Sequence, residues 1–446
     1  MALLGILDDP NAEPIERETM RRVTKRLIPL LMICYFIGYL DRVNVSFAGL
    51  MMTRDLHFSS AVFGFGSGIF FLGYFLFEIP SNLMLERVGA RRWIARILIT
   101  WGIFSGLTAG VWSAWSFYGI RFLLGLAEAG FYPGIILYLT WWFPSYYRSR
   151  IIGVFMTAIP ISVVLGSLVS GALLKADGAL GLAGWQWLFV LEAVPAVILG
   201  FVVLFWLTDL PEHARWLRPE QRTWLAERIL SERRQREDVH SYSLRETFGN
   251  ARVWGLTLVY FGQNVAGYGL VIFLPQIIKR FGVTDTHAAW INAIPFVCAA
   301  VAMVLWGLHS DRTGERSKHT AIACFVTFIG LAVCLGIDSP YWLMAAIIVS
   351  QMGQSSIAPT FWTLPTAMLS GTAAAGGIAM INAVGNLGGF VGPYAMGLIR
   401  DATGNFKLGL FAIACGALVS GIVVLLLGHD RRLERIEGAA AAEAAE

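Results

Sequence analysis

Long apolar runs separated by short polar breaks dominate the pattern of this sequence. A helix rises ~1.5 Å per residue, so about 20 residues cross a hydrocarbon core of ~30 Å, and each run predicts a transmembrane helix. An all-α membrane protein with twelve transmembrane helices is therefore expected. The spans cover 27–50, 62–84, 93–112, 116–140, 150–173, 185–207, 253–278, 287–308, 319–337, 341–364, 373–398 and 406–428.

The predicted spans fall into two groups of six. The longest polar stretch, 208–252, stands between them near the middle of the chain, and its charged pattern predicts a partly helical linker. Two six-helix bundles joined by this linker are the expected organisation. The segments are an N-terminal segment at 1–26, a first bundle at 27–207, the linker at 208–252, a second bundle at 253–428 and a tail at 429–446.

Composition and charge agree with a membrane protein. Of the 446 residues, 56% are hydrophobic and 14% are charged, whereas about a quarter are charged in a typical soluble domain. A soluble enzyme, a disulfide scaffold and a nucleic-acid binder are thereby excluded. About 26 Lys and Arg residues lie in the N-terminal segment, the tail and the even-numbered connections, against about 6 on the opposite side. The positive-inside rule then predicts that both termini are cytoplasmic.

The sequence offers no signature of a metal, a cofactor or ATP. Its five cysteines lie in or beside apolar spans, which favours small packing residues over disulfides. Its seven histidines lack zinc-binding spacing, and there is no phosphate-binding P-loop motif. We therefore expect no metal site, no cofactor and a driving force other than ATP.

A short loop motif occurs once in each half of the chain, between spans two and three and between spans eight and nine. Each copy places an acidic residue before Arg, then Gly, then Arg. Parallel duplication of a six-helix unit is typical of transporters that hold their substrate near the bilayer midplane. The motif residues, which we expect to form a cytoplasmic gate, are Glu86, Arg87, Gly89, Arg91, Asp311, Arg312, Gly314 and Arg316.

Four charged residues lie inside spans of the first half: Asp41, Arg42, Arg121 and Glu128. Charged groups in a bilayer are costly and normally mark a substrate or ion pathway. Arg121 and Glu128 are two helical turns apart and share one face, whereas Asp41 and Arg42 point ~100° apart, so one can face a cavity while the other reaches a partner helix. Arginine stays charged at any biological pH, so a cation in the cavity predicts an anionic substrate.

The two carboxylates are candidates for carrying protons. Burial favours the protonated form of Asp41 and Glu128, and a nearby guanidinium favours the ionised form, so their protonation can change as a cavity switches sides. We expect these two residues to couple transport to protons. The alternative, in which the four charges only form structural ion pairs, stays open. Two further span carboxylates lie nearer span ends, and we interpret Glu78 as a gate or loop partner and Glu192 as structural.

Uncharged polar side chains mark the second half. Amides suit the hydroxyl groups of a hydroxy acid, because an unpaired polar group in a dry site is costly. Hydrogen bonds that only hold helices together are the alternative for any single amide. The candidate substrate residues here are Gln263, Asn264, Trp362, Asn382 and Asn386.

The duplicated loop in a six-plus-six layout resembles the signature of the major facilitator superfamily. The first copy departs from the usual pattern, with Asn82 where Gly is common and Glu86 where Asp is common. Three further segments, 39–44, 77–82 and 128–134, together with Arg121 resemble the anion:cation symporter branch. In the second half, 361–365 and 381–393 resemble bacterial tartrate-type carriers. The resemblance implies that the substrate contacts include Tyr39, Arg42, Tyr74, Arg121, Gln263 and Asn382 or Asn386.

These features together predict a secondary transporter in the bacterial cytoplasmic membrane. Its expected partners are a small organic anion of tartrate or aldonate type, protons rather than sodium, and the lipid bilayer, with no nucleic acid. We expect it to act as a monomer. Aromatic carboxylates such as phthalate, nicotinate or hydroxyphenylacetate are the alternative substrates, and an anion sensor that transports nothing is the alternative from another functional class.

Overall fold

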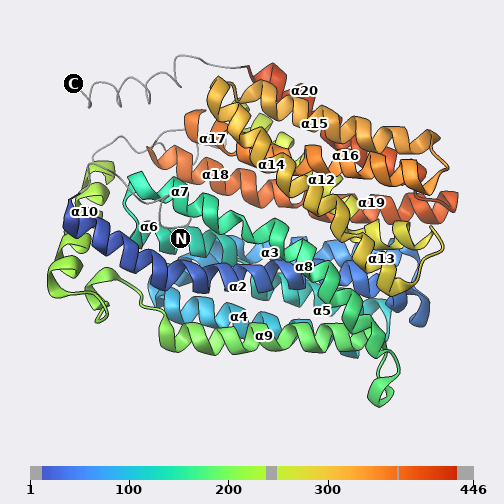
Figure 1. Ribbon diagram of the computed structural model, residues 1–446, viewed down its shortest axis with the longest axis horizontal. Coiled ribbons are helices and arrows are strands. Elements are labelled where there is room, and N and C mark those ends of the chain that lie inside the picture. Colours follow the sequence, from blue (N-terminus) through green and yellow to red (C-terminus); the bar gives the residue numbers. More distant parts are fainter. Residues whose placement is uncertain (1–12, 238–248, 369–370, 429–446) are drawn as a thin grey trace. The chain divides into compact units, whose positions relative to one another are not determined.

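The computed structural model describes residues 13–237, 249–368 and 371–428 (Figure 1). These residues form helices joined by turns and short connections, without a strand among them, so the all-α prediction is confirmed. Residues 1–12 of the predicted N-terminal segment, 238–248 of the predicted linker and the whole predicted tail at 429–446 lie outside the described residues.

The first half and the linker comprise nine α-helices. They are α2 (Pro14–Asp55), α3 (Ser60–Val88), α4 (Ala90–Leu107), α5 (Ala114–Glu128), α6 (Phe131–Trp142), α7 (Ser145–Met156), α8 (Ala158–Leu173), α9 (Gly184–Trp206) and, in the linker, α10 (Pro219–Glu237). All of these counts and bounds refer to the described residues. Short 3-10 turns lie at Thr108–Gly110, Leu174–Ala176, Ala179–Gly181 and Pro211–His213.

The described residues of the second half also form nine α-helices. They are α12 (Ala251–Lys279), α13 (Asp285–Ile291), α14 (Ala293–Thr313), α15 (Ser317–Ala332), α16 (Pro340–Phe361), α17 (Thr363–Met368), α18 (Gly371–Asn386), α19 (Gly388–Thr403) and α20 (Lys407–Leu427). A 3-10 turn lies at Val333–Gly336.

Within the described ranges, ten helical segments are long and apolar enough to cross a membrane. The predicted spans at 341–364 and 373–398 are not among the ten and correspond to α16 and to α18 with α19. α16 is long enough to span a bilayer, and its glutamine, serine and threonine side chains lower its hydropathy. α18 and α19 are 16 residues long each, shorter than the ~20 residues that cross a hydrocarbon core.

The fourth predicted span is broken into α5 and α6. The break lies at Gly130, whose φ of +82° is in the left-handed region that favours glycine. A Cβ at this position would lie 2.4 Å from the Oγ atom of Ser81 on α3, so a larger residue does not fit. Pro133 follows in the first turn of α6, where proline is tolerated. The break makes Glu128 the last residue of α5.

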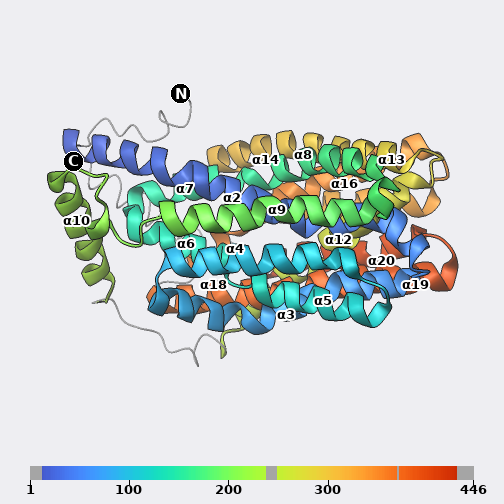
Figure 2. The same cartoon turned by 90° about the horizontal axis from the view of Figure 1, so that it is seen from below.

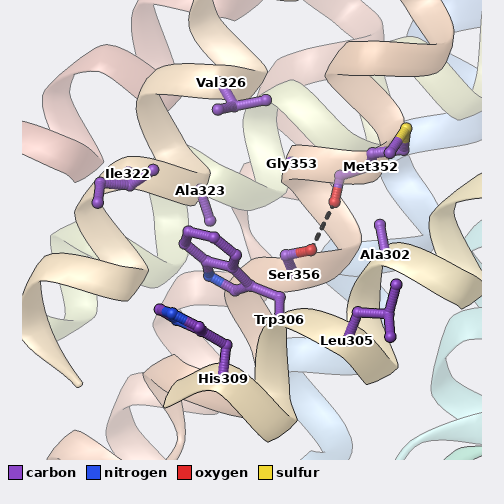
Figure 3. A pocket seen from close by; sticks show the side chains of 10 residues that line it. All are labelled: Ala302, Leu305, Trp306, His309, Ile322, Ala323, Val326, Met352, Gly353 and Ser356. Atoms are coloured by element: carbon purple, nitrogen blue, oxygen red, sulfur yellow. Dashed lines mark hydrogen bonds between the residues drawn. The ribbon is translucent and has the colours of Figure 1, made fainter. Parts of the chain in front are cut away.

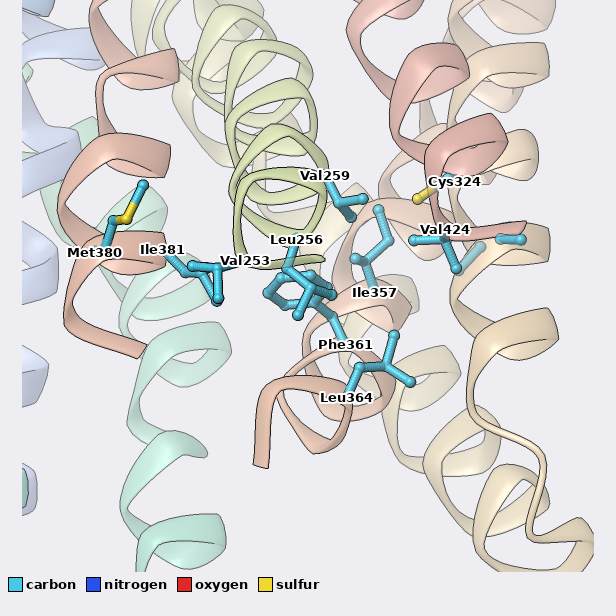
Figure 4. Packing of buried hydrophobic residues seen from close by; sticks show 12 residues of the cluster. Val253, Leu256, Val259, Cys324, Ile357, Phe361, Leu364, Met380, Ile381 and Val424 are labelled. Carbon is cyan, nitrogen blue, oxygen red and sulfur yellow. The ribbon is translucent and has the colours of Figure 1, made fainter. Parts of the chain in front are cut away.

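The described residues divide into two compact units. The first contains the residues up to 51 and those at 72–237, and the second contains 52–71 and the residues from 249 onward. In the first unit, α4 packs against α9 and α5 (Figure 2). In the second unit, α12 packs against α19 and α20, and α15 packs against α16. Figure 4 shows the buried apolar cluster of this unit, to which α12, α15, α16, α17, α18 and α20 contribute side chains.

The predicted helical part of the linker is α10, and polar contacts tie this part of the chain to the rest of the first unit. Arg218, just before α10, forms an ion pair with Glu18 on α2. Glu232 on α10 lies 3.8 Å from the Nη2 atom of Arg148 on α7. The linker helix is thus held by charged groups at the polar ends of the transmembrane helices.

Candidate functional site

Two of the charged residues predicted from the sequence form an ion pair. The Nη2 atom of Arg42 on α2 donates to the Oε1 atom of Glu128 at the end of α5. The Arg42 side chain is 14% exposed and that of Glu128 is 2% exposed, so the cation keeps some access to solvent and the carboxylate has almost none. The Arg42 guanidinium also lies over two aromatic rings, 5.4 Å from the centroid of Tyr74 and 6.0 Å from that of Tyr39.

Arg121 lies in the same electrostatic cluster. It is 1% exposed on α5, and its charge interacts with those of Asp41, Glu128 and Arg42. Its spacing of seven residues from Glu128 places both on one face of α5, as predicted. The two guanidinium groups and two carboxyl groups can balance one another, which reduces the cost of burying each of them.

Asp41 points away from Arg42, toward the interior of the first unit. It is 1% exposed and accepts hydrogen bonds from the indole Nε1 of Trp101 and the hydroxyl of Ser105, both on α4. A third bond comes from the Nδ2 atom of Asn44, 2.7 Å from the Asp41 carboxylate. Asp41 and Arg42 thus reach different helices: Asp41 contacts α4, and Arg42 contacts Glu128 on α5. The three donors are neutral, so no charge pattern in the sequence singles them out.

The second unit holds a network of side-chain amides. The Gln263 amide donates a hydrogen bond of 3.0 Å to the side-chain oxygen of Asn264. The Asn264 amide in turn donates to the backbone oxygen of Gly385 at 3.1 Å and to the side-chain oxygen of Asn386 at 3.5 Å. Gln354 on α16 donates to the side-chain oxygen of Gln263 at 3.0 Å. Three predicted residues, Gln263, Asn264 and Asn386, are therefore brought together from α12 and α18.

The other two predicted residues of this unit lie on α18 and directly after α16. Asn382 is 8% exposed on α18, one turn before Asn386. Trp362 packs against the buried cluster of Figure 4, and its ring lies edge-on to that of Tyr260 with the centroids 5.0 Å apart. In this arrangement Trp362 contributes to packing between α12 and α16.

A cavity of about 420 Å³ lies within the second unit between α14, α15 and α16 (Figure 3). Its walls are mostly apolar, with Trp306, His309 and Ser356 as the polar contributors. None of the predicted substrate residues lines it. An apolar cavity without a cation does not suit a small carboxylate, so this cavity is distinct from the candidate anion site.

The first loop motif is organised around Asp209, which the sequence did not single out. Gly89 has a φ of +95°, and a Cβ there would lie 2.9 Å from the Asp209 carboxylate. The backbone N–H of Arg91 donates to Asp209 at 2.7 Å, and the Arg91 Nε atom lies 3.7 Å from the same carboxylate. Glu86 and Arg87 are exposed. The carboxylate that follows α9 thereby binds the start of α4.

The second loop motif is held by hydrogen bonds between its own residues. Gly314, with a φ of +66°, ends α14, and the Nη1 atom of Arg316 donates to the hydroxyl of Ser310 at 3.0 Å. That hydroxyl donates in turn to the backbone oxygen of Glu315 at 3.1 Å. Arg312 is exposed, and the side chain of Asp311 lies outside what the structure describes.

Across the described ranges, no three His, Cys, Asp or Glu side chains are grouped so as to hold a metal ion.

This chain is similar to known proteins over most of its length. The sequence matches the family model described as Major Facilitator Superfamily over residues 31–288 and 256–445. An Agrobacterium vitis protein named "Putative tartrate transporter" is 52% identical over 372 residues, which cover 83% of this chain and 86% of that protein. A Pseudomonas putida protein named "Putative metabolite transport protein NicT" is 43% identical over 372 residues, covering 82% and 84% of the two chains.

Similarity to solved structures concerns the fold alone. The crystal structure of a bacterial homolog to the human lysosomal transporter Spinster, in an inward-facing and occupied conformation, has a TM-score of 0.73 with this chain at 17% sequence identity. The match covers 90% of this chain and 96% of that one.

Proposed function

Because this chain belongs to the major facilitator superfamily, we propose that it takes up a small organic anion together with protons. It is a multi-pass transporter with the twelve-helix fold of that family, not an enzyme. The substrate is a hydroxylated carboxylate of tartrate or aldonate type, and transport proceeds by alternating access. The 52% identical relative named as a tartrate transporter supports this substrate class. The single observation that carries the proposal is the ion pair of Arg42 with Glu128.

The ion pair suggests how binding and protonation are coupled. Arg42 is a fixed cation with some solvent access, and its fork of donors suits a carboxylate. A substrate carboxylate that binds Arg42 takes the place of the Glu128 carboxylate. Glu128 then lies 2% exposed without its cation, and the uncompensated charge is relieved when the group binds a proton. Each bound anion thereby brings a proton with it.

The remaining predicted residues contribute charge, protons and hydrogen-bonding groups to substrate binding. Arg121 adds a second fixed positive charge next to this pair, and Asp41 is the second proton-carrying carboxylate. Tyr39 and Tyr74 border the Arg42 guanidinium. Amides such as Gln263, together with Asn264, Asn382 and Asn386, supply donors and acceptors for the substrate hydroxyl groups. Trp362 offers an aromatic surface beside them.

Aromatic carboxylates are the second candidate substrates. The observation that favours them is the edge-on pair of Tyr260 and Trp362, since such rings can accept an aromatic acid by stacking. With either class of substrate, the two loop motifs act as a cytoplasmic gate.

We place the protein as a monomer in the bacterial cytoplasmic membrane, with both termini in the cytoplasm.

Counterflow in proteoliposomes tests the proposal. Purified protein is reconstituted with unlabelled tartrate inside, and entry of labelled tartrate is measured against competing sugar acids and aromatic acids. We expect exchange that hydroxy acids inhibit and that Arg42→Ala abolishes. The matched control is Arg54→Ala, which removes a 66% exposed cation from the same helix and should leave exchange unchanged. Inhibition by aromatic acids alone would select the second candidate, and no anion exchange by folded protein would refute transport and favour a sensor.

The coupling ion needs a separate measurement. Uphill uptake driven by an inward proton gradient should exceed uptake driven by an inward sodium gradient of the same size. Glu128→Gln should abolish this uphill uptake while it preserves counterflow, because an amide cannot release a proton. Uphill uptake that persists in this variant would contradict the assigned role of Glu128.

A further inference from the structure

A third buried carboxyl group lies behind Asp41 in the first unit. Glu192, in the first half of α9, is 4% exposed and accepts a hydrogen bond from the hydroxyl of Ser170 on α8 at 2.7 Å. The Asn44 amide, which donates to Asp41, also interacts with the Glu192 side chain. Asn44 therefore links two acidic side chains that come from α2 and α9.

The surroundings of these two acids differ in hydrogen-bond donors. Asp41 accepts three hydrogen bonds, from Trp101, Ser105 and Asn44, and also lies within the field of the Arg121 cation. Glu192 accepts a hydrogen bond from the Ser170 hydroxyl and interacts with the Asn44 amide, while its Oε2 atom is buried without a hydrogen-bond partner. In the described part of the chain, the charge that acts on Glu192 is that of Asp41, which has the same sign.

Two neighbouring carboxyl groups in a dry interior cannot both stay ionised at low cost, so one of them holds a proton. Asp41 has the better support for a negative charge, because three donors and a cation stabilise it. Glu192 has fewer donors and no cation acting on it, and a buried carboxylate without a cation binds a proton instead. Protonation also gives Glu192 a donor of its own, and the buried oxygen of Asn44 that has no partner is an acceptor.

We propose that Glu192 is a neutral carboxylic acid that positions Asn44 and leaves the negative charge of the pair on Asp41. It is a positioning residue, since it acts on the proton-carrying carboxylate through the Asn44 amide. The pair then carries one negative charge, and uptake of one proton by Asp41 makes it neutral. Only the consequence for coupled uptake rests on the proposed function; the protonation of Glu192 stands independently of it.

Infrared difference spectroscopy of the purified, reconstituted protein tests the protonation directly. Subtracting the spectrum of Glu192→Gln from that of the wild type at neutral pH should leave the C=O stretching band of a protonated carboxyl group. Glu128→Gln is the matched control, because Glu128 is paired with Arg42 and should contribute carboxylate bands instead. Carboxylate bands in the Glu192→Gln difference would overturn the proposal. If that variant does not fold, Glu192→Asp should retain the protonated band at a shifted frequency.

Transport supplies the second readout. Glu192→Gln is neutral and keeps a donor, so uphill uptake should stay within about twofold of wild type. Glu192→Leu removes the donor and should lower uptake about tenfold, the effect of one lost buried hydrogen bond. Loss of uptake in Glu192→Gln would mean that the residue acts as a charge and would contradict the proposal. If the wild type moves no anion yet shows the protonated band, the proposed function fails and the assignment of Glu192 stands.

Discussion

Removal of one partner of the Arg42–Glu128 ion pair should destabilise the protein more than removal of both. Arg42→Gln leaves the Glu128 carboxylate at 2% exposure without its cation, and Glu128→Gln leaves the Arg42 cation unpaired by that carboxylate. Breaking a buried ion pair in this way costs ~3–5 kcal/mol. Because Arg42 is 14% exposed and water can partly solvate it, we reduce the expected cost to about 2–4 kcal/mol.

The double variant Arg42→Gln with Glu128→Gln contains no buried charge at this place, and the two amides can hydrogen-bond. Its cost should therefore be only about 1 kcal/mol, which gives a coupling energy of at least about 3 kcal/mol in a double-mutant cycle. A loss of 1 kcal/mol lowers Tm by about 2–4 °C in units of about 150–250 residues. The single variants should then melt roughly 4–16 °C below the wild type, and the double variant about 2–4 °C below it.

Thermal unfolding of the purified protein in detergent, followed by the far-UV circular dichroism of its helices, measures this cycle. The matched control pair is Lys318 with Glu315, whose atoms are 3.8 Å apart and whose lysine is 67% exposed. Its cycle should give less than about 1 kcal/mol of coupling, because solvent screens an exposed pair. If the Arg42 and Glu128 effects are simply additive, the pair is not a desolvated ion pair and the reasoning fails.

Two further predictions concern the helix termini. Gly130→Ala should lower stability by about 2–4 kcal/mol, because the left-handed φ and the 2.4 Å approach to Ser81 both oppose a side chain. The control is Gly119→Ala, where an added Cβ meets nothing within 4 Å. Equal Tm values for the two variants would contradict this account. Asp401, beyond the predicted span, accepts hydrogen bonds from the backbone N–H groups of Ser60 and Ala61 at the start of α3. Burial acts to raise the pKa of Asp401, but the hydrogen bonds from Ala61, Ser59 and Ser60 outweigh it and lower the pKa below its usual 3.8. The stabilising effect of the Asp401 carboxylate is therefore present above pH 3.8 and is lost as the pH falls through the lowered pKa. Asp401→Asn should cost about 1–2 kcal/mol at pH 7 and less in acid, which Tm measured against pH would show. A difference in Tm that does not depend on pH would contradict the assignment.

The spans and the intramembrane charges could be predicted from the sequence because each depends on local properties. Apolar runs of sufficient length partition into a bilayer whatever their neighbours, and the exclusion of charge from lipid makes Asp41, Arg42, Arg121 and Glu128 conspicuous. Helical geometry also predicted that Asp41 and Arg42 point in different directions.

The break of the fourth span had a local signal that span length concealed. Pro133 three residues after Gly130 is typical of a helix start, yet the apolar run continues through both residues. What requires glycine there is Ser81, from another helix, and this close approach exists only when α3 and the α5–α6 break are packed together.

Tertiary structure alone decided which neutral groups surround each charge. Trp101 and Ser105 lie 60 and 64 positions from Asp41, and Asp209 lies 118 positions from Arg91. A neutral donor has no distinctive pattern along the chain, because the same tryptophan or serine packs equally well without a hydrogen bond. Desolvation makes those donors decisive: once water is removed, each buried charge depends on the few polar atoms that the packed helices bring to it.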